Sequence, residues 1–406
     1  MLFLLSLIKK LHNIKEIPCS FVKSMLNLCK EILRSHGHLV HTRNDLQLTC
    51  TSQAGTLKEV LSMAKKTSLW ALLLVMLVTM LAAGCGGGGG EKKAAPANDG
   101  KKLIIYTSMK ESLIKGIVDG FKKKYPDIDV DYQSAGAGKL MAKIAAERQS
   151  GKILADVIWT SEVPDFYKMK DEGMLEKYES PVLKETVNPF DDYDGSFHAA
   201  RLGTLGIIIN TDKVKTAPTQ WSDLMKPEFK NGFGIANPAL SGTSYMSVAL
   251  LEKQFGWEFF ENIKANGGRI GKGSGQVIDD TASGELVASL AVDYITNAKI
   301  KKGAHIQMCY PPELLVVPSP VAIFKGTTKL DASKKFVDYL LSKEAQTLVA
   351  EQGTIPVRED VTIPAKFNLP APKEALAKSI KINYPEAVKT KEATIKKFSD
   401  IMQIKK

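Results

Sequence analysis

The chain has 406 residues and carries 55 Lys or Arg against 44 Asp or Glu, so its net charge at pH 7 is +11. Residues 1–84 hold ten of those basic residues and four of the acidic ones, and without them the net charge falls to +5. The remaining lysines are scattered rather than clustered, which argues against a nucleic-acid-binding function.

Residues 63–84 have the order of a secretory signal. Met63-Ala64-Lys65-Lys66 precedes an apolar run, and small residues follow it up to Cys85. The run from Leu69 to Ala83 is shorter than the roughly 20 residues that span a bilayer. The end of this segment resembles the lipobox of bacterial lipoproteins. That resemblance implies that Cys85 becomes the first mature residue and carries acyl chains that anchor the protein to a membrane.

The 62 residues before this signal do not fit a secreted protein, because a signal peptide should begin the chain. They contain three of the five cysteines and four of the six histidines. A zinc site of Cys50 with His36, His38 and His41 would not have a usual ligand spacing. We interpret residues 1–62 as a non-native extension from a start codon assigned too early, with translation beginning at Met63.

A flexible linker and a two-domain body follow the signal. Residues 85–101 are rich in glycine and show no apolar pattern, which is typical of a tether. The remaining chain of about 300 residues is long enough for two domains. Once Cys85 is lipidated, Cys309 is left without a partner, so no internal disulfide is possible.

Strands and helices then alternate along the chain. Apolar or alternating runs predict strands at 103–106, 128–132, 155–159, 205–210, 234–236, 289–292 and 321–324. Helical spacing predicts helices around 113–121, 140–145, 244–255, 256–266, 332–341 and 343–352, and in the tail 373–404. Such alternation indicates an α/β fold with a mainly parallel sheet and helices on its faces.

Small polar residues follow four of the predicted strands, where ligands bind in open parallel sheets. The candidate residues in these loops are Ser108, Gly138, Ser161, Glu162, Ser241, Gly242 and Thr243. Because free N–H groups at helix N-termini attract anions, the four loops together predict a shared anion site. Each loop by itself could instead hold an ordinary N-cap.

No catalytic constellation is visible, so we do not expect an enzyme or a bound cofactor. His198 and His305 have no nucleophile or metal ligand beside them in a known motif. The run Gly271–Gly275 lacks the spacing of a phosphate-binding loop, and we interpret it as a surface turn.

The chain from about residue 102 to 362 resembles the extracellular solute-binding proteins of ABC importers, in the branch that binds ferric iron, aminoethylphosphonate or sugar phosphates. The segments that carry the resemblance include Tyr106–Glu111, Ala155–Glu162, Asn210–Lys213, Trp221–Leu224, Ala236–Thr243, Val321–Gly326, Ser342–Gln346 and Ile355–Arg358. The resemblance implies a type II periplasmic-binding-protein fold with two lobes, each a mixed, mainly parallel sheet flanked by helices. The implied boundaries are 102–200 with 318–360 for lobe 1, 201–317 for lobe 2, and 361–406 for C-terminal helices. Hinge strands are expected at 198–210 and 318–324.

The resemblance leaves the ligand open between iron and an organic anion. Its iron branch uses a His, a Glu and a pair of tyrosines, whereas here Met109 stands at the His position and Ile295 replaces one tyrosine. Glu162 and Tyr294 remain, and they could hold Fe(III) only with help from a captured anion.

An oxyanion fits the sequence better than iron. Neutral donors from the serine, glycine and threonine candidates would surround a phosphonate such as 2-aminoethylphosphonate, or a sugar phosphate. Asp293 would then face the far end of the ligand, where a carboxylate suits an ammonium group or sugar hydroxyls. The alternatives are a solvated loop carboxylate for Asp293 and core packing for Tyr294.

The resemblance also implies the partners and the compartment. We expect a monomer in the cell envelope, on the outer face of the cytoplasmic membrane or in the periplasm, that delivers its ligand to an ABC permease and its ATPase. A sensory lipoprotein of the same fold is the alternative.

Overall fold

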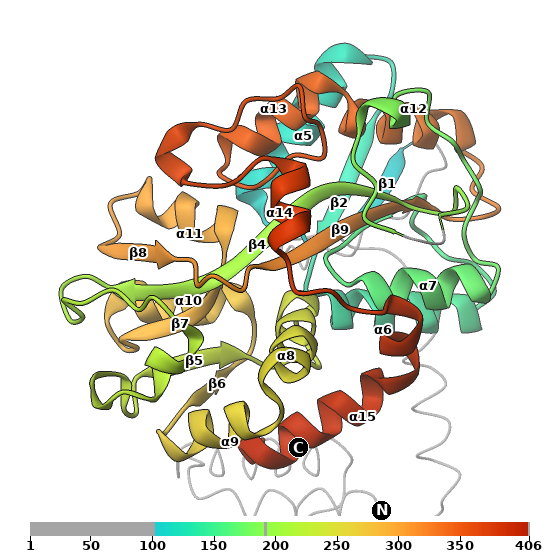
Figure 1. Cartoon of the computed structure of the whole chain (residues 1–406). Helices are drawn as coiled ribbons and strands as arrows, with labels where there is room; N and C mark the ends of the chain where they lie inside the picture. Colours follow the sequence, from blue (N-terminus) through green and yellow to red (C-terminus); the bar gives the residue numbers. More distant parts are fainter. Residues whose placement is uncertain (1–101, 191–192, 405–406) are drawn as a thin grey trace, which may run out of the picture. The chain divides into compact units, whose positions relative to one another are not determined.

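Two long antiparallel strands cross the centre of the molecule. The computed structural model describes residues 102–190 and 193–404, in which β4 (His198–Asn210) pairs with β9 (Leu315–Ile323). Figure 1 shows both strands running between the elements at its top right and those at its lower left. Every residue of both strands is buried. The two crossing strands predicted at 198–210 and 318–324 are therefore present, although the second begins at Leu315.

The two strands join the halves of one mixed sheet. Within the described residues the sheet has nine strands, eight of which follow the order β2-β1-β3-β9-β4-β7-β5-β6, while the ninth, β8, pairs with β4. In the first half, β1 runs parallel to β2 and β3, and in the second half β5 runs parallel to β6 and β7. β4 and β9 are antiparallel to their neighbours β7 and β3. The remaining strands are β1 (Leu103–Thr107), β2 (Val130–Ser134), β3 (Val157–Trp159), β5 (Phe233–Ala236), β6 (Arg269–Gly271), β7 (Ala288–Val292) and β8 (Ile306–Cys309).

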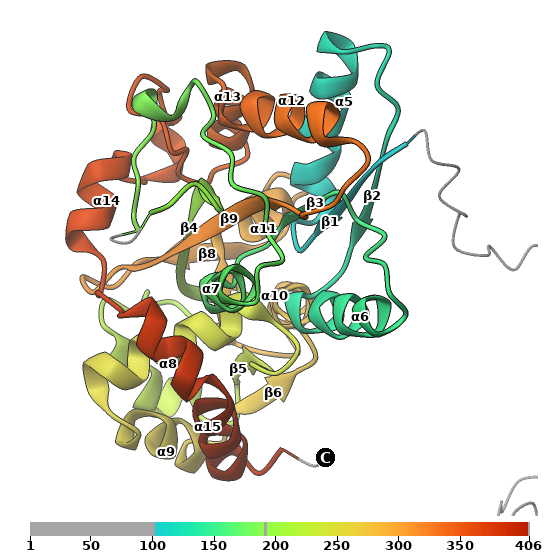
Figure 2. The same cartoon turned by 90° about the vertical axis from the view of Figure 1, so that its right-hand side faces the viewer.

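Helices cover the sheet (Figures 1 and 2). In the first half they are α5 (Glu111–Lys124), α6 (Ala137–Gln149), α7 (Val163–Asp171), α12 (Leu330–Leu341) and α13 (Lys343–Glu351). In the second half they are α8 (Gly242–Phe255), α9 (Glu258–Ala265), α10 (Ser274–Ser283) and α11 (Asp293–Ile300). Short 3-10 turns lie at Leu183–Glu185, Trp221–Met225, Pro227–Phe229 and Ala365–Phe367.

The apolar periodicity read from the sequence forms the buried faces. In α5 the buried residues are Leu113, Ile114, Ile117, Val118 and Phe121, which span the range 113–121 predicted from helical spacing. The predicted strands and helices are all present, although β4 begins at His198 instead of residue 205 and β9 at Leu315 instead of residue 321. Burying such faces against the sheet is what stabilises the elements, because short helices are marginal in water.

Several elements escaped prediction. α7, α10 and α11 and the short strands β6 and β8 were not expected. The run Gly271–Gly275, interpreted as a surface turn, is a bend only at Lys272 and Gly273, because Gly271 ends β6 and Ser274 opens α10. A three-residue strand and a helix that begins with Ser and Gly carry too few apolar positions for a periodic signal.

The C-terminal segment is helical, as predicted. It contains α14 (Pro372–Lys378) and α15 (Tyr384–Met402). α15 contacts α7 of the first half and also α8 and α9 of the second half, and Figure 1 shows it below α7 and α8 and beside α9. The ring of Phe398 in α15 packs edge-on against that of Phe260 in α9, with the two ring centres 5.2 Å apart. This helix therefore bridges the two halves away from β4 and β9.

The proposed extension 1–62, the signal 63–84 with Cys85, and the linker 85–101 lie outside the described residues. Among the residues that the structure describes, no helix is long and apolar enough to cross a membrane.

Candidate functional site

One cavity collects the N-termini of five helices. Its volume is about 360 Å³, and its walls include the N-cap residues of α5, α6, α8, α10 and α11, which are Lys110, Gly136, Ser241, Gly273 and Val292. Parallel strands place their carboxyl ends at one edge, and each of these helices follows such a strand. Five partial positive charges therefore point toward the same space.

Hydroxyl groups line the second-half wall of the cavity. The side chains of Ser241, Thr243 and Ser274 lie within hydrogen-bonding distance of one another, at 2.9 to 3.1 Å. Ser241 also accepts a hydrogen bond from Ser244 N at 3.4 Å and so caps α8. One wall thus offers three hydroxyls beside two helix N-termini, a donor set that suits an oxyanion.

The first-half wall carries hydroxyls of its own. Ser108 accepts a hydrogen bond from Ser161 N at 3.2 Å, and Ser161 Oγ lies 2.9 Å from Ser319 Oγ of β9. Ser134 donates to Met109 O at 2.7 Å. Met109 itself is buried and does not line the cavity.

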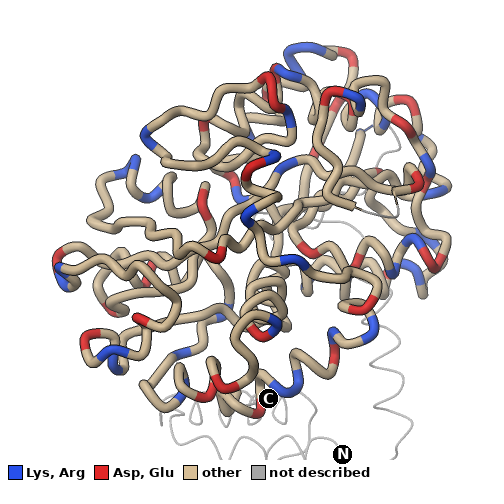
Figure 3. The backbone as a smooth tube through the Cα atoms, viewed as in Figure 1, with Lys and Arg blue, Asp and Glu red and all other residues tan. Residues whose placement is uncertain are grey.

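Four cationic side chains line the cavity. They are Lys110, Lys139, Lys272 and Arg201, and no Asp or Glu is among the described lining residues. Burial, assisted by the nearby Lys139 charge, lowers the pKa of Lys110. On the face seen in Figure 3, Lys and Arg are interspersed with Asp and Glu. The exclusively positive charge of the cavity lining is therefore a local feature.

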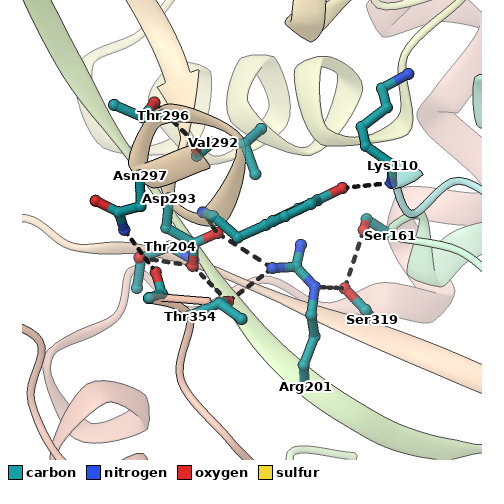
Figure 4. Close-up of polar contacts among 12 residues, drawn as sticks. Lys110, Ser161, Arg201, Thr204, Val292, Asp293, Thr296, Asn297, Ser319 and Thr354 are labelled. Carbon is teal, nitrogen blue, oxygen red and sulfur yellow. Dashed lines mark hydrogen bonds and ion pairs between the residues drawn. The ribbon is translucent and has the colours of Figure 1, made fainter. Parts of the chain in front are cut away.

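Arg201 is the buried member of this set. It comes from β4 with only 1% of its surface exposed, and its Nη1 lies 3.1 Å from Asp293 Oδ1. The guanidinium also donates to Ser319 Oγ and Thr354 Oγ1 (Figure 4). It lies 4.7 Å from the centre of the Tyr294 ring. Arg201 thus ties strands β4 and β9 to α11.

Tyr294 joins the halves across the cavity. Its hydroxyl accepts a hydrogen bond from Lys110 N at 2.9 Å, so α11 of the second half touches the start of α5 in the first. Burial raises the pKa of this phenol. The side chain is therefore a neutral wall of the cavity at pH 7.

Six of the nine residues predicted for the site line the cavity: Ser108, Ser161, Ser241, Gly242, Thr243 and Tyr294. Gly138, Glu162 and Asp293 do not. Whether the six bind a ligand stays a prediction, while the position of the other three has a physical reason in each case.

Gly138 lies where the halves approach each other. A Cβ at this position would be 2.3 Å from Ala239 O, and one at the neighbouring Gly136 would be 2.4 Å from Leu240 O. Such distances leave no room for a methyl group. The glycines therefore permit the loop before α8 to pack on α6, and Gly138 does not reach the cavity.

Glu162 is enclosed by the C-terminal helix. Lys391 of α15 forms ion pairs with both Glu162 and Asp165. Burial and the Asp165 charge raise the pKa of Glu162 to about 7, although the Lys391 ammonium opposes them. The two carboxylates in turn raise the pKa of Lys391. Glu162 thus belongs to a buried ionic cluster with Lys391 and Asp165, and it does not line the cavity.

Asp293 is also fully enclosed. Oδ1 accepts from Arg201 Nη1 and Tyr294 N, and Oδ2 accepts from Thr204 N, Thr204 Oγ1 and Thr354 Oγ1 at 2.6 to 3.0 Å. The residue has no exposed surface. Its expected position facing the far end of a ligand is therefore not found.

Sequence reasoning missed the cationic lining. Lys110 and Lys139 lie in the strand-end loops, where only the small polar residues and Glu162 were candidates for the site. Lys272 and Ser274 belonged to the run interpreted as a surface turn. Arg201 gave a usable signal, because a charge inside an otherwise apolar strand is rarely buried without a partner.

Metal-ligating residues do not gather in the part of the chain that the structure describes. It contains no group of three or more His, Cys, Asp or Glu side chains placed to hold a metal ion. The cavity has one lining tyrosine, Tyr294, and Glu162 lies outside it.

Comparison with known proteins places these features in a family context. A family model described as bacterial extracellular solute-binding protein matches residues 152–387, more than half of the chain.

Individual relatives bind different solutes according to their names. A putative 2-aminoethylphosphonate-binding periplasmic protein of Salmonella typhimurium is 27% identical over 256 residues, which cover 60% of this chain and 74% of the relative. The major ferric iron-binding protein of Neisseria meningitidis is 24% identical, with 66% and 83% covered. Among solved structures, the periplasmic binding protein AfuA from Actinobacillus pleuropneumoniae, with fructose-6-phosphate bound, superposes with a TM-score of 0.65 at 24% identity, over 75% of this chain and 99% of AfuA.

Proposed function

Because this chain belongs to the family of bacterial extracellular solute-binding proteins, we propose that it captures a small anionic solute, an organophosphonate or a sugar phosphate, and delivers it to an ABC importer. Its fold is the type II periplasmic-binding-protein fold expected from the sequence. The family is one of binding proteins and not of enzymes. Its members work with a membrane permease and an ATPase, and these are the proposed partners here.

One observation carries the choice of an anion. Five helix N-termini, three lysines and several hydroxyls line a single cavity that has no carboxylate among its described lining residues. A volume of about 360 Å³ falls in the range of small-molecule sites. Phosphate and phosphonate oxygens would accept hydrogen bonds from the free backbone N–H groups and hydroxyls.

The proposed ligand position lies between two lobes. Lobe 1 comprises residues 102–200 and 318–360, and lobe 2 comprises residues 201–317, with 361–406 as C-terminal helices. The sheet order supports this division, because β1, β2 and β3 lie on one side of the β4–β9 pair and β5, β6 and β7 on the other. Ligand contacts with both lobes would stabilise a closed state.

Calorimetry with the purified protein tests the proposal. The ligands are inorganic phosphate, 2-hydroxyethylphosphonate, 2-aminoethylphosphonate, fructose 6-phosphate and Fe(III) with citrate. Micromolar or tighter binding of at least one phosphorus oxyanion is expected. Binding of iron alone would overturn the anion proposal and favour the ferric-iron receptor that the Neisseria relative suggests.

The envelope location rests on the sequence. We propose that Cys85 is acylated and tethers the body to the membrane through residues 86–101, so that a monomer stays near its permease. Cys85→Ser should release the protein from the membrane fraction, and N-terminal sequencing of the precursor should find Met63 as its start. A gene neighbourhood with a sensor kinase instead of permease genes would favour the sensory alternative.

A further inference from the structure

The charged side chains around the cavity restrict the charge that the rest of the ligand can carry, in addition to favouring a phosphonate or phosphate group. Three of the four cationic side chains, Lys110, Lys139 and Lys272, have no Asp or Glu oxygen within 4.0 Å among the described residues. Lys110 is half-buried, while the other two are exposed at the rim. Their charge is therefore not cancelled locally.

The nearest buried carboxylates are not available to a ligand. Asp293 accepts five hydrogen bonds, two on Oδ1 and three on Oδ2. A carboxylate has about four lone-pair sites, so its acceptor capacity is filled. Figure 4 shows it directed toward Thr204, Thr354 and Arg201. Its charge is also balanced by Arg201 in a buried ion pair.

Glu162 is unavailable for a different reason. Lys391 holds it together with Asp165 in the contact between α7 and α15. It is 2% exposed, and it does not line the cavity. An ammonium group inside the cavity would thus meet lysines and helix N-termini, and no described carboxylate could pair with it.

We propose that the cavity selects a phosphonate or phosphate whose far end is neutral or anionic, and that it rejects one whose far end carries an ammonium group. This inference rests on the proposed function and narrows it. It departs from the name of the Salmonella relative, whose ligand is an aminophosphonate. The lysines are specificity-determining residues in this view, because they repel a cation as well as attract an anion.

Three ligands of nearly equal size test the inference by calorimetry on the purified protein. They are 2-aminoethylphosphonate, 2-hydroxyethylphosphonate and phosphonoacetate, which end in an ammonium, a hydroxyl and a carboxylate. The hydroxyl ligand should bind at least tenfold more tightly than the amino ligand, and phosphonoacetate at least as tightly as the hydroxyl ligand. Equal or tighter binding of the amino ligand would overturn the inference and leave the proposed function standing. If none of the three binds, and fructose 6-phosphate and inorganic phosphate also fail, both are overturned.

A charge variant separates selectivity from folding. Lys272→Gln removes one rim charge of the cavity, and Lys115→Gln removes one exposed lysine of α5 that does not line it. Lys272→Gln should lower the affinity ratio of phosphonoacetate to 2-aminoethylphosphonate by threefold or more, whereas Lys115→Gln should leave this ratio unchanged. An unchanged ratio in Lys272→Gln, with the wild-type preference intact, would contradict the role given to this lysine.

Discussion

At the scale of single residues, the hydroxyl cluster of Ser241, Thr243 and Ser274 is the best-defined donor set of the cavity. Ser241 has a second task, because it caps α8, and its loss would also destabilise the helix by about 1 kcal/mol. Thr243 lines the cavity without capping a helix, so it reports on the ligand more cleanly.

Thr243→Val should weaken the binding of a phosphonate. The substitution removes one hydroxyl donor with little change in the shape of the side chain. A hydrogen bond to a charged group such as the phosphonate contributes about 1.5–3 kcal/mol, or roughly 10- to 150-fold in Kd. Ser241→Ala should weaken binding as well. Thr243→Ser keeps the hydroxyl and serves as the control. Equal affinities of the valine and serine variants, measured by calorimetry, would remove Thr243 from the site.

His198 provides a pH test that does not depend on the ligand. It is 4% exposed, its Nδ1 lies 2.9 Å from Tyr193 Oη, and burial lowers its pKa to about 4. Between pH 6.5 and 4 the unfolded chain binds a proton that the folded protein refuses, so this residue makes stability fall as the pH falls through that window.

His198→Asn should remove this loss. The difference in unfolding free energy between wild type and variant should shift by up to about 3 kcal/mol from pH 7 to pH 4, with wild type losing more. Urea unfolding at both pH values measures it. The raised pKa of Glu162 has the opposite effect: its stabilising contribution to the folded protein is full below pH 4.5 and is lost as the pH rises through 7. This contribution cancels in the difference, because wild type and His198→Asn both contain Glu162. A constant difference across the window would show that folding does not shift the pKa of His198.

At the scale of elements, α15 connects the halves through a buried ionic cluster. Lys391 pairs with Glu162 and Asp165 at the start of α7, and its ammonium lies 5.5 Å from the ring centre of Tyr245 in α8. Tyr245 Oη in turn donates to Ala387 O of α15 at 3.0 Å. Lys391 thus contacts side chains of α7 and α8, which lie on opposite sides of the β4–β9 pair.

Lys391→Met should destabilise the protein by about 3–5 kcal/mol at pH 7.5, because it leaves two buried carboxylates without a counter-charge. Lys389→Met, two residues earlier and exposed, is the matched control. The triple variant with Glu162→Gln and Asp165→Asn should recover most of the loss. If urea unfolding finds the two lysine variants equally stable, Lys391 does not hold the cluster.

At the scale of the whole molecule, the two halves meet closely around the cavity. Tyr294 Oη accepts from Lys110 N, and a Cβ on Gly242 would lie 2.7 Å from the Glu162 side chain. The contact of Gly138 with Ala239 O is closer still, at 2.3 Å for an added Cβ. Such contacts join the two halves, and in the proposed function they belong to the closed, ligand-bound arrangement.

Gly138→Ala should therefore oppose closure. The methyl group meets a backbone carbonyl that cannot rotate away, and overpacking of this kind costs about 1–3 kcal/mol, or roughly 5- to 150-fold in ligand affinity. The unfolding free energy should fall far less, because alanine favours α6 over glycine by about 1 kcal/mol. Gly116→Ala in α5, where an added Cβ meets nothing within 4 Å, is the control. Unaltered affinity in Gly138→Ala would show that binding does not require this contact.

The local sequence determined much of the fold. Apolar spacing predicted α5 and the last six residues of β4, at 205–210, whereas the full span of β4 was expected from the family resemblance. Tyr294 was expected from the family resemblance, and strand-end loops with Ser, Thr and Gly predicted five further lining residues of the cavity, because the carboxyl ends of parallel strands must meet at one edge. These are properties of neighbouring residues, so a linear pattern contains them.

Only the tertiary structure decided which charged side chains pair with one another. Asp293 is paired with Arg201, which is 92 residues away in the chain, and Glu162 is paired with Lys391 from the C-terminal helix. Both carboxylates were predicted at the ligand, and both are enclosed by cations that no spacing rule connects to them. Gly138 likewise serves a contact with Ala239. Ion pairing and steric fit depend on which distant segments meet in space, so the sequence by itself determined where the cavity lies, and the folded structure decided that its lining is cationic.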